Sequence, residues 1–130
     1  MRQQTQNQGF TLIELLVVVA IIGILSSIGV VSYGKYKTSA EKKQAEISLN
    51  SIYLAEQEYK SNNGEYYFNS STSNLVSNLF DGVDDLSEQA FSFSTTNANT
   101  LTITATKKSD SNCRISITQT NKKPNTTSAC

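Results

Sequence analysis

A run of twenty uncharged residues near the start of the chain constrains the fold more than any other feature. The segment from Leu15 to Gly34 is dominated by Val, Ile and Leu. At a rise of about 1.5 Å per residue, a helix of this length spans a hydrocarbon core of about 30 Å. A strand is a poor alternative, because strands rarely exceed about ten residues and an isolated segment in lipid satisfies its own backbone only as a helix. The run therefore predicts a membrane-spanning helix.

The residues before this run are polar and argue against a secretory signal peptide. Such a peptide needs a basic start, an apolar core of about 7 to 15 residues and a cleavage site with small residues. Here Arg2 is the only charged side chain from Met1 to Gln8, the apolar run is longer, and Glu14 lies at its start. An ordinary single-span anchor fits the length better, but it leaves the carboxylate of Glu14 unexplained.

The stretch "GFTLIELLVVVAIIGIL", residues 9–25, resembles the class III signal of type IV pilins and the related pseudopilins. In that family a membrane peptidase cuts after the glycine, and the new N-terminal phenylalanine is methylated. The resemblance implies that residues 1–9 are a leader peptide, that the cut falls between Gly9 and Phe10, and that Phe10 becomes an N-methylated N-terminus. One departure is that many members carry a proline in the membrane helix where this chain has Val31.

Glu14 is a functional candidate on physical grounds as well. An ionisable group within a membrane helix costs about 2.5 to 3.5 kcal/mol at mid-helix, so it is expected to have a role or a partner. Three roles are open: pairing with the Phe10 amine of the same chain, pairing with the Phe10 amine of a neighbouring chain, and a carboxylate that snorkels to the headgroups. The second would set the register between subunits, and the family resemblance favours this assembly role.

Two features point to opposite orientations for the rest of the chain. Four lysines follow the apolar run within ten residues, whereas only Arg2 and the amine of Met1 precede it, which favours a cytoplasmic location by the positive-inside rule. Cys113 and Cys130 are the only cysteines, and an even pair in a small domain indicates a disulfide in an oxidising compartment, with two free thiols as the alternative. We give more weight to the cysteines and to the family resemblance, which imply a periplasmic or extracellular C-terminal domain.

A helical pattern continues past the membrane run to about Asn62. Residues 39–61 contain no Pro or Gly and are rich in good helix formers. Two apolar stripes lie on nearly opposite faces, one formed by Ala45, Leu49, Ile52, Ala55 and Tyr59, the other by Tyr36, Ala40, Ile47 and Leu54. The first stripe is predicted to cover the chain's own sheet and the second to pack on other copies, with tolerated surface residues as the alternative. Asn63 and Gly64 suit a left-handed cap at the helix end.

Residues 65–88 predict a loop with a short helix near residues 74–80, because their apolar residues show no clean period. The loop carries Asp81, Asp84 and Asp85, and acidic loops bind calcium in some pseudopilins. The three carboxylates lack the alternating spacing of an EF-hand loop, so a solvated acidic turn is favoured. Two thiols without any His also fall short of a zinc site, and no metal site is predicted.

Beyond Gln89 the hydrophobic period becomes two, which is typical of strands. Three strands are expected, at residues 90–95, 100–106 and 113–119, in an antiparallel meander with one apolar and one hydroxylated face. A bond between Cys113 and Cys130 would close a loop of about 18 residues, hold the tail, and contribute about 3 kcal/mol of stability.

The expected fold class is therefore α+β, a long N-terminal helix packed on a small C-terminal antiparallel sheet, as in the pilin fold that the resemblance implies. Residues 10–34 are assigned to the transmembrane helix segment, residues 35–62 to its amphipathic continuation, and residues 63–130 to the globular head.

The sequence contains no recognisable catalytic machinery. It has no His for acid–base chemistry, no Gly-rich phosphate loop, and no Ser or Cys beside a candidate base, so neither an enzyme nor a cofactor site is predicted. Its formal net charge is zero, which gives no basic footprint for nucleic acid. The function is therefore expected to lie in assembly.

The family resemblance implies a structural subunit of a type IV pilus. Such a chain is held as a precursor in the bacterial inner membrane, processed by a prepilin peptidase, and polymerised by an assembly platform into an extracellular helical filament of identical subunits. One alternative is the major pseudopilin of a type II secretion system, which the acidic residues favour slightly and the cysteine pair disfavours. Another, from a different class, is a monomeric membrane-anchored binding module.

Overall fold

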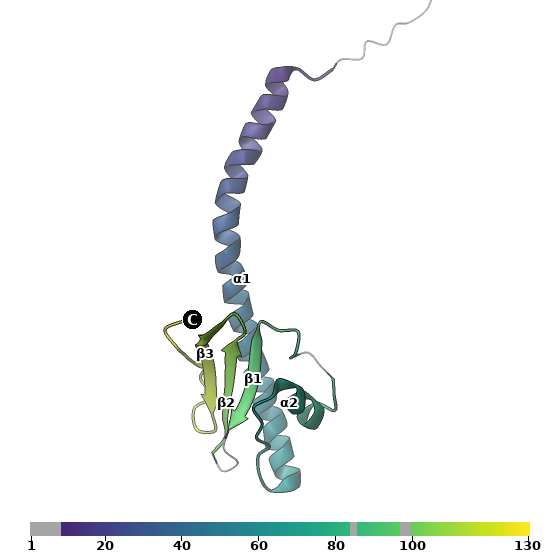
Figure 1. The fold of residues 1–130 in the computed structure, drawn as a ribbon, viewed down its shortest axis with the longest axis vertical. Coiled ribbons are helices and arrows are strands. Elements are labelled where there is room, and N and C mark those ends of the chain that lie inside the picture. The colour runs from purple at the N-terminus through teal and green to yellow at the C-terminus, as the bar shows by residue number, and fades with distance from the viewer. Residues whose placement is uncertain (1–8, 84–85, 97–99) are drawn as a thin grey trace, which may run out of the picture. The chain divides into compact units, whose positions relative to one another are not determined.

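The computed structural model describes residues 9–83, 86–96 and 100–130 of the chain. Two helices, α1 (Leu12–Asn63) and α2 (Thr72–Leu79), precede four strands, β1 (Phe91–Thr96), β2 (Thr102–Lys107), β3 (Asp110–Thr118) and β4 (Asn125–Thr126) (Figure 1). The chain divides into two compact units, Met1–Thr38 and Ser39–Cys130, and helix α1 contributes to both.

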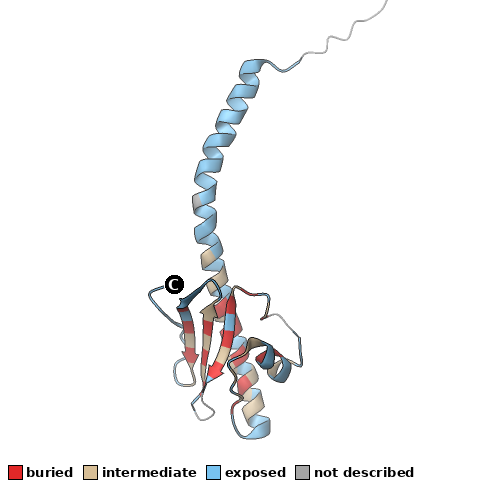
Figure 2. Cartoon of the chain, in the orientation of Figure 1, coloured by how far each residue is buried: buried red, intermediate tan, exposed pale blue. Residues whose placement is uncertain are grey.

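The first unit contains the apolar part of α1, and its own chain leaves this part uncovered. Every large apolar side chain from Leu12 to Ile28 is between 51 and 80% exposed (Figure 2). Within the described residues, α1 is the one helix that is long and apolar enough to cross a membrane. A helix that is apolar on all sides needs lipid or other apolar chains around it.

The second unit is a four-stranded antiparallel sheet, in the order β1-β2-β3-β4, packed on the second part of α1. The expected α+β class, a long helix with a small antiparallel sheet, is confirmed. Buried residues recur along the strands (Figure 2). The apolar ones among them form one core with residues of α1 and α2. The three long strands contribute Phe91, Phe93, Ile103, Ala105, Cys113, Ile115 and Ile117 to this core, and Leu101, just before β2, adds to it.

Two details of the sheet differ from the expectation. Strand β3 begins at Asp110, three residues early, because Lys107 pairs with Asp110 and a two-residue turn closes the hairpin there. A fourth strand, β4, was not expected at all. It pairs with Ile115 and Ser116 of β3, and it is too short and too exposed to show an alternating pattern in the sequence.

The edge of β1 that faces away from β2 is covered by the segment just before α2 and by the first residue of α2. The hydroxyl of Thr72 accepts the Phe93 N–H at 2.8 Å and donates to the Phe93 carbonyl at 3.1 Å. The Thr95 N–H donates to the Asn69 carbonyl at 2.8 Å. These bonds satisfy the backbone groups that an edge strand leaves unpaired.

Helix α1 ends within one residue of the expected position. Gly64 adopts a left-handed φ of 87° and donates its N–H to the Lys60 carbonyl at 2.8 Å, which is the αL cap. Asn63 remains the last helical residue, and its side-chain amide donates to the Tyr59 carbonyl at 2.9 Å. Of the two expected cap residues, Gly64 takes the left-handed role because it has no Cβ to clash.

The first apolar stripe of α1 is buried against the sheet, as expected, but it is not purely apolar. Ala45, Leu49 and Ile52 are fully buried, whereas Ala55 and Tyr59 are half-buried. On the same side of the helix, Ser48 and Glu56 are also buried, and neither was expected. The second stripe is left uncovered: Ile47 and Leu54 are 67 and 68% exposed.

Candidate functional site

The expected processing residues lie just ahead of helix α1. Gly9 and Phe10 are non-helical and exposed, and Phe10 is 91% exposed. No other described part of the chain lies within 4 Å of the position where a Gly9 Cβ would be. A protease can therefore reach the bond between these two residues without unfolding any secondary structure.

Glu14 forms a capping box with Thr11 at the start of the helix. Its Oε2 accepts the Thr11 backbone N–H at 2.8 Å and the Thr11 hydroxyl at 2.7 Å, while the Thr11 Oγ1 accepts the Glu14 N–H at 3.3 Å. This reciprocal arrangement satisfies N–H groups that a helix start otherwise leaves unpaired. The capping role was missed from the sequence, although the threonine three residues before the glutamate is its known signature.

The capping box leaves the charge of Glu14 without a counter-ion. Both side-chain bonds use Oε2, and within the described residues no cation lies within 4.0 Å of the carboxylate. Phe10, Ile13, Val17 and Val18 lie beside it and form a shallow, open apolar surface with it. In the uncut chain the Phe10 nitrogen belongs to a peptide bond, so a pairing of Glu14 with the Phe10 amine requires cleavage after Gly9.

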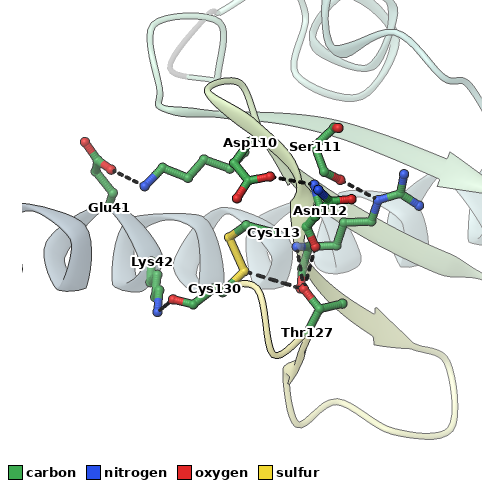
Figure 3. Close-up of a disulfide and its surroundings, with 10 residues drawn as sticks. Glu41, Lys42, Asp110, Ser111, Asn112, Cys113, Thr127 and Cys130 are labelled. Atoms are coloured by element: carbon green, nitrogen blue, oxygen red, sulfur yellow. Dashed lines mark hydrogen bonds and ion pairs between the residues drawn. A yellow bond between two sulfur atoms is a disulfide. The ribbon is translucent and has the colours of Figure 1, made fainter.

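The second group of candidate residues is the C-terminal cysteine pair, which is bonded in the structure. Cys113 of β3 and Cys130 are joined by a disulfide, with 4.5 Å between their Cα atoms (Figure 3). Thr127 adds three bonds to β3 beside it. Its hydroxyl accepts the Arg114 N–H at 3.0 Å and donates to the Asn112 carbonyl at 2.8 Å, and its N–H donates to the Arg114 carbonyl at 2.9 Å. The tail is thus held by backbone pairing as well as by the disulfide.

Two lysines connect this tail to helix α1, and the sequence did not indicate either contact. Lys42 donates from Nζ to the carbonyl of Cys130 (Figure 3). Lys122 places its Nζ 5.0 Å from the centre of the Tyr53 ring, within the range of a cation–π contact. Lys42 is one of the four lysines that follow the apolar run, and its bond ties the disulfide-linked tail to α1.

The acidic loop shows no metal geometry in the part of it that the structure describes. Asp81 is exposed and has a left-handed φ of 51° in the turn after α2, whereas Asp84 and Asp85 lie outside the described residues. Across residues 9–83, 86–96 and 100–130, no three His, Cys, Asp or Glu side chains come close enough together to hold a metal ion.

Comparison with known proteins identifies a family motif in the N-terminal segment. Residues 4–30 match the family model described as "Prokaryotic N-terminal methylation motif", and this range includes Gly9, Phe10 and Glu14. Over these residues the N-terminal segment matches a methylation motif. The resemblance to the class III signal of type IV pilins is therefore confirmed.

Several curated proteins are similar to the chain. It is 38% identical over 65 residues to the type IV major pilin protein PilA of Myxococcus xanthus, covering 50% of this chain and 30% of that protein. It is 43% identical over 65 residues to the type IV major pilin protein PilE of Neisseria gonorrhoeae, covering 50% of this chain and 35% of that protein. It is 36% identical over 66 residues to the type II secretion system core protein G of Escherichia coli, covering 51% of this chain and 46% of that protein. The chain thus covers less than half the length of each of these relatives. No solved structure matches it.

Proposed function

We propose that this chain is the structural subunit of a type IV pilus. The observation that carries the proposal is an apolar helix that begins within the match to a methylation motif and whose apolar side chains are exposed. Lipid of the inner membrane covers this helix in the precursor, and the helices of other copies cover it in an extracellular filament. The similarity to proteins named as major pilins supports this reading.

Processing by a prepilin peptidase starts the pathway. The peptidase removes residues 1–9 by cutting the exposed bond between Gly9 and Phe10, and the freed amine of Phe10 is methylated. The accessibility of this bond, ahead of the first helical residue, Leu12, supports the cut at this position. The new positive charge lies about one helical turn from Glu14.

Glu14 then sets the register between subunits in the filament. Its Oε2 is already occupied by Thr11, which leaves Oε1 to accept the Phe10 amine of a neighbouring subunit. Within the packed helices this pair is desolvated, and removing one partner of such a pair costs about 3 to 5 kcal/mol. Subunits out of register leave the two charges apart and are therefore disfavoured.

The uncovered stripe of α1 supplies a second contact between copies. Ile47 lies beside a surface hollow of about 510 Å³ on the second unit, to which Phe80, Val83 and Leu86 also contribute. Both Ile47 and Val83 are more than two-thirds exposed. Burial of these side chains by another subunit, delivered by the assembly platform, stabilises the filament around its helical core.

The substitution Glu14→Gln tests the register role without disturbing the cap. Gln also serves in a capping box, so the helix start keeps its bonds to Thr11 while the charge is lost. We expect normal precursor level, normal processing and a sharp fall in sheared surface filaments, counted by electron microscopy. Ser27→Ala is the matched control, because it removes one polar side chain from the same apolar helix, and it should leave filament number unchanged.

Filaments of normal number and length from Glu14→Gln cells would exclude the register role. The snorkelling carboxylate would then be the better account of Glu14.

A second candidate is the major pseudopilin of a type II secretion system, favoured by the similarity to core protein G. Deletion of the gene distinguishes the candidates. Loss of surface filaments with normal protein export supports the pilus subunit, and loss of export supports the pseudopilin. If neither filaments nor export change, the chain is a membrane-anchored module that does not polymerise.

A further inference from the structure

Glu56 is a buried acid in the middle of the helix–sheet interface. Its side chain is 0% exposed. Oε2 accepts the Tyr67 backbone N–H at 2.9 Å, but Oε1 has no hydrogen-bond partner within the described residues. A buried polar atom without a partner is destabilising, and more so when the group is charged. The site therefore favours the neutral acid over the carboxylate.

Tyr67 belongs to the segment of residues 64–71, which connects α1 to α2 and which we call the connecting segment. This segment is bonded to the edge of β1 through Thr95. The Asn69 N–H donates to the Thr95 Oγ1 at 2.9 Å, the Thr95 N–H donates to the Asn69 carbonyl at 2.8 Å, and the Thr95 Oγ1 donates to the Tyr67 carbonyl at 3.0 Å. Glu56, the connecting segment and β1 thus form one continuous set of hydrogen bonds.

No opposite charge from the helices or the connecting segment compensates Glu56. On α1, Lys60 lies one turn further on, with its Nζ 4.2 Å from the centre of the Tyr66 ring, and Glu58 is exposed. The phenol of Tyr66 accepts a bond from the Gln57 side chain at 3.0 Å. Helix α2 contains no ionisable residue. The remaining ionisable groups of this region are Tyr53, Tyr59, Tyr67 and the exposed Glu65.

The sheet and the tail supply no counter-charge either. Strand β1 has no ionisable residue. Lys107 of β2 is engaged with Glu41 at 3.3 Å. The charged residues of β3, Asp110 and Arg114, are exposed, and Lys122 of the tail lies over the ring of Tyr53. Burial raises the pKa of Glu56 to about 7, and the Tyr67 N–H opposes this rise only in part.

We propose that Glu56 is a pH-sensitive latch, which holds the connecting segment on β1 while it is protonated and releases it when it is ionised. Lifting the segment admits water to Oε1 and relieves the buried charge. The closed state binds the proton more tightly than the open state, so opening is favoured progressively as pH rises from 4.5 to about 7 and levels off above that. This device is independent of the proposed pilus function.

Amide hydrogen exchange measured by NMR on the full chain in detergent micelles tests the latch. The amides to follow are those of Tyr67, Asn69 and Thr95, with rates corrected for the intrinsic pH dependence of exchange. From pH 5.5 to 8.5 their opening constant should rise about 30-fold, given pKa values of about 7 closed and 4.5 open. Glu56→Gln should make the profile flat, whereas Glu58→Gln, which changes an exposed carboxyl on the same helix, should keep the parent profile.

Three results would overturn the latch. One is a flat profile in the parent protein, and another is an unchanged slope in Glu56→Gln. The third is that these amides open with the same constant as the amides of the β2–β3 ladder at every pH. In that case Glu56 would affect only the global stability of the head. If Glu56→Gln does not fold, a carbon-13 titration of the Glu56 carboxyl in the parent decides, and a midpoint near 4.5 contradicts the proposal.

Discussion

Replacing Cys130 by Ser isolates the contribution of the disulfide. Cys113 is buried in the core, so changing it would also alter packing, whereas Cys130 is half-buried and lies at the chain end. The two cysteines are 17 residues apart, and the chain-entropy model gives about 3 kcal/mol for a loop of this size. We therefore expect Cys130→Ser to lower the free energy of unfolding of the head by about 3 kcal/mol.

Urea unfolding followed by tyrosine fluorescence measures this change in the full chain in micelles. With a slope of about 1 to 1.5 kcal/mol per M for so small a head, the midpoint should fall by about 2 to 3 M urea. Ser128→Ala, an exposed change in the same tail, is the matched control and should leave the midpoint in place. The reduced parent protein should behave like Cys130→Ser.

Trypsin provides a second readout, because a cut after Lys122 frees the last eight residues only when the disulfide is absent. A midpoint shift below about 0.5 M, together with equal retention of the tail, would refute the reasoning. The pairing of β4 and the bonds of Thr127 would then already restrict the tail without help from the disulfide.

Three further predictions follow from the structure. Intact-mass measurement of assembled protein should show a chain that begins at methylated Phe10, and retention of residues 1–9 would contradict the proposed processing. The free energy of unfolding should fall by up to about 3 kcal/mol from pH 4.5 to 8, because Glu56 has a pKa of about 7 when folded and 4.5 when unfolded, and urea titrations should show this loss disappear in Glu56→Gln. Gly64→Ala should destabilise the head by about 1 kcal/mol in the same assay, because its φ of 87° is unfavourable for any residue with a Cβ while the surrounding space is open, and an unchanged midpoint would argue against a left-handed cap at this residue.

The regular elements followed from local patterns in the sequence. The uncharged run and the absence of Pro and Gly between Gly34 and Gly64 placed helix α1, and alternation placed β1, β2 and β3 to within a few residues. These patterns are reliable because burial of one helix face or one sheet face imposes them on every residue of the element.

The features that were missed depend on contacts between distant segments. Strand β4 consists of two exposed residues that are held in place by Thr127 and the disulfide, so no hydrophobic period marks it. Glu56 falls on the buried side of α1, but its burial is tolerated only because Tyr67, eleven residues later, supplies a backbone donor. The capping role of Glu14 is different. The spacing of three residues between Thr11 and Glu14 is a local signal of a capping box, and it can be read from the sequence alone.

The two edges of the sheet restrict how copies of this head can associate. Thr72 and Asn69 occupy the hydrogen-bonding groups of β1 on one side, and the other side ends in a two-residue strand preceded by Lys122, Lys123 and Pro124. Charges, proline and short strands at an edge all oppose strand-by-strand joining of sheets. Within the described residues, the head therefore presents no long unprotected β edge through which the sheets of two copies could join. The exposed apolar faces of α1 are then the surfaces left for ordered contacts between copies, so the proposed filament would form by helix packing and not by extension of the sheet.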